Sequence, residues 1–143
     1  MASWIEVRCW LQSRSVTFVG GEGWAGTCWP PDGKGGLGKT TVVNVLHEIE
    51  CGSQRLVASA HVCAEDQVSV KDFLRWNGRL RGSGLVFQRG EVFVRRTVPL
   101  EPLTLEHLSR VLTHLAHDAS LIRTDVSRRI EGNGRCSPAT QVA

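Results

Sequence analysis

The segment from Thr40 to Glu50, which reads TTVVNVLHEIE, constrains the fold of this chain more than any other. Helical spacing joins Val42, Val45 and Ile49, whereas strand spacing joins every second residue from Thr41. The segment holds three valines and two threonines, whose branched Cβ atoms restrict χ1 and favour extended structure. It therefore predicts a strand.

The elements on either side are predicted from apolar spacing and turn residues. They are a helix over Ser3–Ser13, strands over Ser15–Val19 and Arg55–Ala64, a helix over Ser69–Leu80, hairpin strands over Gly84–Gln88 and Val92–Leu100, and an amphipathic helix from Thr104 to Thr124. Trp24–Trp29 has the composition of a further short strand, within a Gly- and Pro-rich stretch, and is left out of the order. The expected fold is α+β, an antiparallel sheet with helices in the order α-β-β-β-α-β-β-α.

The chain has 143 residues, of which 41% are hydrophobic and 22% are charged, as in ordinary globular domains. No linker divides the pattern, so we expect one domain over residues 1–127. Residues 128–143 carry glycines and a proline with little to bury, which predicts a flexible tail.

Charge and cysteine content argue against several classes of function, and a small basic nucleic-acid binder stays a minor alternative. The net charge of +3 comes mainly from arginines spread along the chain, not from the clustered cations of a nucleic-acid-binding protein. The five cysteines form no CxxC pair, which argues against a zinc site or a disulfide framework. Without a long apolar run or a signal-peptide pattern, the chain is expected to be cytoplasmic and not bound to a membrane.

A phosphate-binding motif lies before the predicted strand. The stretch GKGGLGKTT, from Gly33 to Thr41, satisfies the pattern G-x-x-x-x-G-K-[ST] and resembles the deviant Walker A loop of the ParA and MinD ATPases. In this alternative the chain is a P-loop ATPase, complete or truncated, that binds ATP and Mg²⁺. Its phosphate-binding residues would be Lys34, Gly35, Gly36, Gly38, Lys39, Thr40 and Thr41.

The context of the motif argues against this alternative. A P-loop connects a buried strand to a helix, but Gly- and Pro-rich sequence precedes Lys39 and a predicted strand follows it. The predicted strand over Arg55–Ala64 also lacks an aspartate at the tip of an apolar run that could serve Mg²⁺.

No catalytic or metal site is nominated elsewhere. His107, His114 and His117 lie on the polar face of the last predicted helix, without an indicated fourth ligand. No arrangement of Ser, His and Asp, or of paired carboxylates, stands out.

The order of elements resembles that of the bacterial YbjN family and, through it, the type III secretion chaperone fold. The residues that carry the resemblance are LQSRSVTFVGG, KTTVVNV, RLVASAHV, FLRWNGRLRGSGLVF and the stretch from Glu91 to Ile122, with Trp76-Asn77 and Val98-Pro99-Leu100 the most telling. The resemblance implies no catalytic residue, no cofactor, and a regulatory or chaperone-like role in binding another polypeptide, often as a dimer. A non-enzymatic protein-binding module is therefore the expected function.

Overall fold

The computed structural model describes residues 3–14, 18–29, 41–80 and 82–136, and side chains as far as residue 130. Its elements are α1 (Trp4–Arg14), β1 (Phe18–Gly21), β2 (Trp24–Trp29), β3 (Thr41–Glu50), β4 (Ser53–Ala64), a 3-10 turn (Glu65–Gln67), α2 (Val70–Asn77), β5 (Gly84–Gln88), β6 (Glu91–Pro99) and α3 (Leu105–Cys136).

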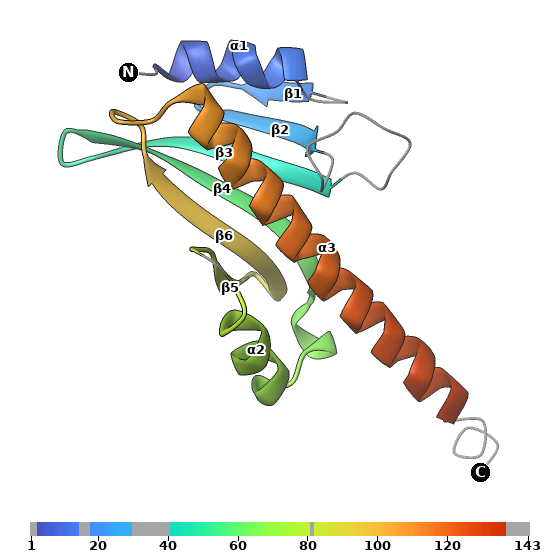
Figure 1. The fold of residues 1–143 in the computed structure, drawn as a ribbon. Coiled ribbons are helices and arrows are strands. Elements are labelled where there is room, and N and C mark those ends of the chain that lie inside the picture. Colours follow the sequence, from blue (N-terminus) through green and yellow to red (C-terminus); the bar gives the residue numbers. More distant parts are fainter. Residues whose placement is uncertain (1–2, 15–17, 30–40, 81, 137–143) are drawn as a thin grey trace.

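The strands form one antiparallel sheet in the order β1-β2-β3-β4-β6-β5 (Figure 1). The predicted α+β class is confirmed, and so is the strand after Thr40. The sheet has one strand more than the expected order, because Trp24–Trp29 pairs along its whole length with β3. Alternate residues of this strand, Ala25, Thr27 and Trp29, are buried, so its side chains contribute to the core.

Two tight turns fix the registers of the long hairpins. Cys51 and Gly52 between β3 and β4, and Arg89 and Gly90 between β5 and β6, all have positive φ. Two successive residues of positive φ match the right-handed twist of the strands, which makes such turns the favoured two-residue connections in hairpins.

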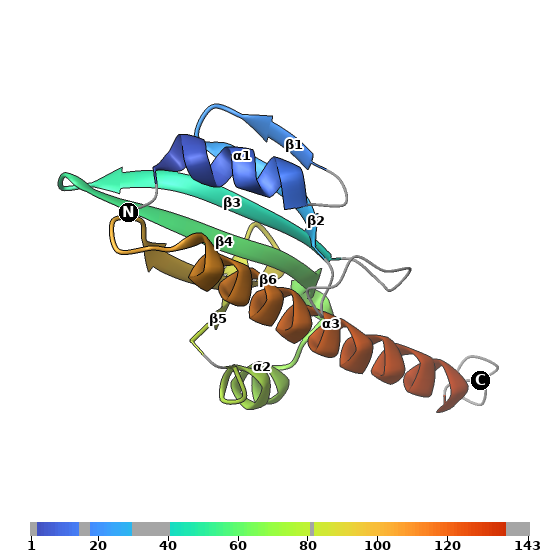
Figure 2. The same ribbon diagram turned by 45° about the horizontal axis from the view of Figure 1, so that its top comes forward.

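All three helices lie on the same face of the sheet (Figures 1 and 2). The predicted leucine stripe of α3 faces the strands, and Leu108, Leu112 and Leu115 are almost completely buried. Helix α1 packs beside it, where Trp10 meets Trp29 with ring centroids 5.5 Å apart. The Nε1–H of Trp29 in turn donates to Oγ1 of Thr113 on α3, over 3.1 Å. The core therefore lies between this face and the helices.

The last helix is longer than predicted. Its start is as expected, since Oγ1 of Thr104 accepts a hydrogen bond from the backbone N–H of His107. The apolar spacing predicts an end near Thr124, but α3 continues to Cys136. Beyond Thr124, Val126 is buried, and Asp125 and Arg129 contact side chains of α2. Residues 128–136 of the expected flexible tail thus continue the helix, and residues 137–143 lie outside the described part.

Candidate functional site

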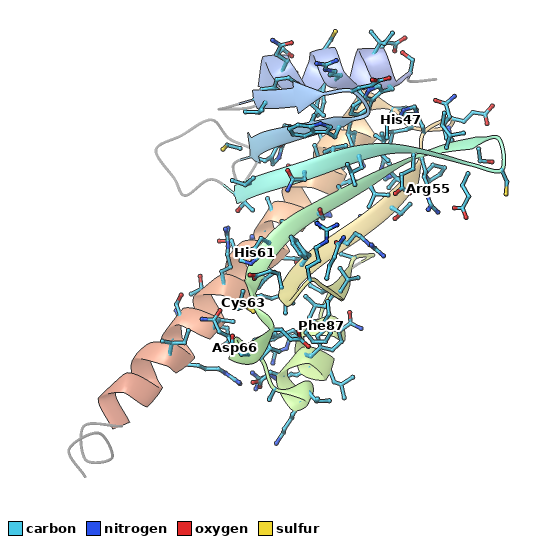
Figure 3. All side chains as sticks on the ribbon, turned by 180° about the vertical axis from the view of Figure 1, so that it is seen from behind. His47, Arg55, His61, Cys63, Asp66 and Phe87 are labelled. Carbon is cyan, nitrogen blue, oxygen red and sulfur yellow. The ribbon has the colours of Figure 1, made fainter. Side chains whose placement is uncertain are left out.

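The face of the sheet turned away from the helices, here called the outer face, is covered by none of the elements that the structure describes. Figure 3 views the sheet from this side, with α3 behind the strands. A sheet face left without a covering layer normally carries polar residues. The outer face departs from this pattern over β1, β2, β3 and part of β4.

The strand registers place apolar side chains in two rows on the outer face. Trp24 pairs with Leu46, and Leu46 pairs with Val57 of the next strand. Four residues along each strand, Cys28 pairs with Val42. The surface formed by Val19, Trp24, Val42, Leu46 and Val57 is called the outer patch from here on.

Four of the five side chains of the outer patch are exposed to solvent: Val19 (59%), Trp24 (38%), Val42 (55%) and Leu46 (42%). Val57 is buried and lies between Leu46 of β3 and Thr97 of β6. Between the two apolar rows lie the small or short residues Gly26 and Asn44.

Close packing on β1 holds the tryptophan of the patch. A Cβ atom added to Gly21 would lie 2.3 Å from Nε1 of Trp24, so only glycine lets the indole ring lie across β1 at this point. The backbone of β1 at Gly21 therefore packs against the indole ring, which restricts its position and gives the patch a rigid apolar surface.

Two groups of charged side chains near the outer patch are paired internally. At one end Arg55 bridges Glu48 and Glu50, with N–O distances of 2.8 Å in each case. Across the sheet, Nε2 of His61 lies 2.6 Å from Oε2 of Glu91. These charges have partners, and Arg95, opposite Ser59, is the cation on this face for which the described residues supply no ion pair.

The predicted phosphate-binding residues lie almost entirely outside the described residues. This holds for Lys34, Gly35, Gly36, Gly38, Lys39 and Thr40. Thr41 is described: it is completely buried and begins β3, at the position where a P-loop would continue into a helix. Its hydroxyl oxygen accepts a hydrogen bond from Nη2 of Arg123. Thr41 thus has a structural role in the core.

The other candidate chemistry is dispersed. His107, His114 and His117 are exposed on α3, as the polar-face reading expects. Within residues 3–14, 18–29, 41–80 and 82–136, no three or more His, Cys, Asp or Glu side chains are placed to hold a metal ion. None of the described helices combines the length and the apolarity needed to cross a bilayer.

Cys63 and His61 are separated by an irregularity in the strand. Simple alternation would put residues two apart on one face. A register shift between His61 and Cys63 instead turns the thiol into the core, opposite Val92. Burial, and then the negative charges of Glu91 and Asp66, raise the pKa of Cys63 to about 11, which makes the thiol a poor nucleophile.

The sequence indicates the outer patch through its hydrophobic pattern and not through a short motif. From Val42 to Leu46 only Asn44 is polar, so both faces of this strand are apolar. Such a run indicates a strand covered on both faces, yet one face here has no cover within the described chain. No family model and no curated protein matches the chain.

Proposed function

We propose that this chain is a non-enzymatic, cytoplasmic protein-binding module, regulatory or chaperone-like, whose outer patch packs against a partner polypeptide or a second copy. The observation that carries the proposal is the group of solvent-exposed apolar side chains on one uncovered sheet face. Contiguous exposed apolar surface is uncommon on monomeric proteins and marks interaction sites. The proposal assigns no catalytic residue and no cofactor.

The edge strand beside the patch favours the same role. The opposite edge, β5, is partly occupied, because the backbone N–H of Leu85 donates to Oδ1 of Asn77. In contrast, β1 reads Phe18-Val19-Gly20-Gly21, with neither the proline nor the charged residue that commonly protects an edge. An extended partner segment could add to β1 while its side chains cover Val19 and Trp24.

The resemblance to YbjN proteins and secretion chaperones gives independent support, because it implies binding of another polypeptide without catalysis. It is a resemblance of element order and apolar pattern, to which the confirmed α+β class conforms.

Site-specific photocrosslinking in cells tests the proposal. A benzophenone amino acid placed at Leu46 should yield covalent protein adducts, because the side chain lies in the outer patch. The same amino acid at Glu106, an exposed position on α3, is the matched control. The adducts should disappear when Val42→Asp is added. Equal crosslinking at both positions, or none at Leu46, would count against a binding role for this face.

The Gly33–Thr41 motif is what favours the second candidate, a P-loop ATPase. The strand that begins at Thr41 and the hydrogen bond from Arg123 weigh against it. Titration of fluorescent ATP with Mg²⁺ against the native protein and Lys39→Ala separates the two candidates. Saturable binding that the substitution abolishes would favour the ATPase.

A further inference from the structure

A second candidate site lies between α2 and α3, away from the outer patch. The structure contains a cavity of about 280 Å³ there. Trp76 and Ile122, which are nearly completely buried, form its apolar wall, and Leu121 lies at its rim with 57% of its surface exposed. A cavity of about 150 Å³ accommodates one benzene molecule, so this one has room for roughly two apolar side chains.

A network of charged side chains holds α2 against α3 beside the cavity. Asp72 of α2 pairs with Arg129 of α3, and Oδ2 of Asp125 accepts a hydrogen bond from Nε1 of Trp76 over 2.8 Å. Arg75 lies 3.4 Å from the same carboxylate oxygen. These contacts come from both helices, so the cavity has walls that do not depend on a ligand.

Two arginines beside the cavity have no carboxylate partner among the described residues. Arg79, just after α2, and Arg128, on α3, both line the cavity and are exposed. Within the part of the chain that the structure describes, neither makes an ion pair. Of the two carboxylates in the lining, Asp125 is engaged by Trp76 and Arg75. Arg79 and Arg128 outnumber the other one, Asp118, which has an interaction of its own. The charge left for a ligand is therefore positive.

The cavity and the two arginines beside it are called the groove from here on. We infer that the groove binds a short acidic segment of a partner polypeptide, in which apolar side chains enter the cavity and flanking carboxylates pair with Arg79 and Arg128. Arginine is suited to this task because its planar guanidinium group pairs with carboxylates in a bidentate manner. Arg79 follows α2 and Arg128 lies on α3, so carboxylates on both sides of the apolar residues would match them. The inference does not rest on the outer patch.

Fluorine NMR of protein labelled with 5-fluorotryptophan tests the inference. The chain has five tryptophans, and Trp76→Phe identifies the resonance of Trp76. The probe is the blocked peptide Glu-Glu-Ile-Leu-Glu-Glu, and the controls replace every Glu by Gln or by Lys. Of the three peptides, we expect only the acidic one to shift the Trp76 resonance. The shift should be saturable, with a dissociation constant in the millimolar range or below.

Charge reversal supplies the matched variants. The double variant Arg79→Glu/Arg128→Glu should bind the acidic peptide about tenfold or more weakly and should gain affinity for the lysine peptide. The control, Arg95→Glu/Arg110→Glu, makes the same change in net charge at exposed positions outside the cavity. It should bind as the native protein does. Arg79→Gln/Arg128→Gln repeats the loss of binding if the reversed variant does not fold.

Several outcomes would overturn the inference. They are a Trp76 resonance that no peptide shifts, an equal shift with all three peptides, and a shift with decanoate but not with the acidic peptide, which would indicate a small anionic amphiphile. Val42→Asp should retain acidic-peptide binding, and the groove variants should retain crosslinks at Leu46. The failure of either proposal can thus be recognised separately.

Discussion

Nη2 of Arg123 donates a hydrogen bond to Oγ1 of Thr41 over 2.6 Å, which ties α3 to the first residue of β3. Thr41 is completely buried, and Arg123 is half-buried. Burial lowers the pKa of Arg123 from its usual value, as expected for a cation removed from water. The interaction therefore gives a partly desolvated charge an acceptor in the core.

We expect Thr41→Val to destabilise the protein by about 1–3 kcal/mol, because the isosteric side chain leaves the guanidinium group without this acceptor. Urea denaturation gives the free energy of unfolding. In a double-mutant cycle, Arg123→Met should make the second substitution at Thr41 nearly neutral. Additive effects of the two substitutions would show that the hydrogen bond contributes little.

Asp72 predicts a loss of stability in acid. Burial raises the pKa of its carboxyl, but hydrogen bonds from Ser69 and Arg129 and the charges of Arg129 and Arg75 outweigh burial and hold the pKa below its ordinary value of 3.8. A carboxyl whose pKa is lower in the folded state stabilises the protein above the unfolded pKa, and this stabilisation is lost as the pH falls below about 4.

Asp72→Asn should therefore lower the free energy of unfolding by about 2–3 kcal/mol at pH 7 and by less at pH 3. Urea denaturation at the two pH values measures the difference. Asp66→Asn, at an exposed acidic position, is the matched control and should not change the pH dependence. Equal destabilisation at both pH values would mean that the charge of Asp72 does not contribute.

Local patterns predicted most of this fold. The β-branched residues after Thr40 specified a strand, and the spacing of Leu108, Leu112 and Leu115 specified the buried face of α3, because side-chain direction follows directly from the repeat of each element. The turn at Arg89-Gly90 was likewise recognisable from its glycine.

What could not be predicted depends on contacts between distant segments. The end of α3 was placed too early because Asp125 and Arg129 look like exposed polar residues in the sequence, whereas in the fold they contact Trp76 and Asp72. The apolar run from Val42 to Leu46 shows that both faces of β3 are apolar, but it does not show which face the helices leave uncovered. The groove combines residues from α2 and α3 for the same reason.

Cysteine reactivity should differ sharply between sites. Cys9 and Cys51 are exposed, whereas Cys63 is buried and its pKa is raised to about 11, first by burial and then by Glu91 and Asp66. Because the thiolate is the reactive form, Cys63 should remain unmodified at pH 8 while the exposed thiols react. Brief alkylation with iodoacetamide and peptide mass spectrometry measure this. Modification of Cys63 at the rate of Cys51 would show that the bulge does not keep the thiol in the core.

Two leucines of α3 provide a final comparison, because they differ in burial but share a helix. Leu112 has no exposed surface, whereas 57% of Leu121 is exposed. Truncation of a buried leucine removes apolar contacts and leaves a cavity, which costs about 2–5 kcal/mol. We expect Leu112→Ala to lower the free energy of unfolding by that amount and Leu121→Ala to change it by less than about 0.5 kcal/mol. Leu121 lies at the rim of the groove, so Leu121→Ala should instead weaken binding of the acidic peptide. A large loss of stability from Leu121→Ala would mean that this leucine belongs to the core and not to a binding surface.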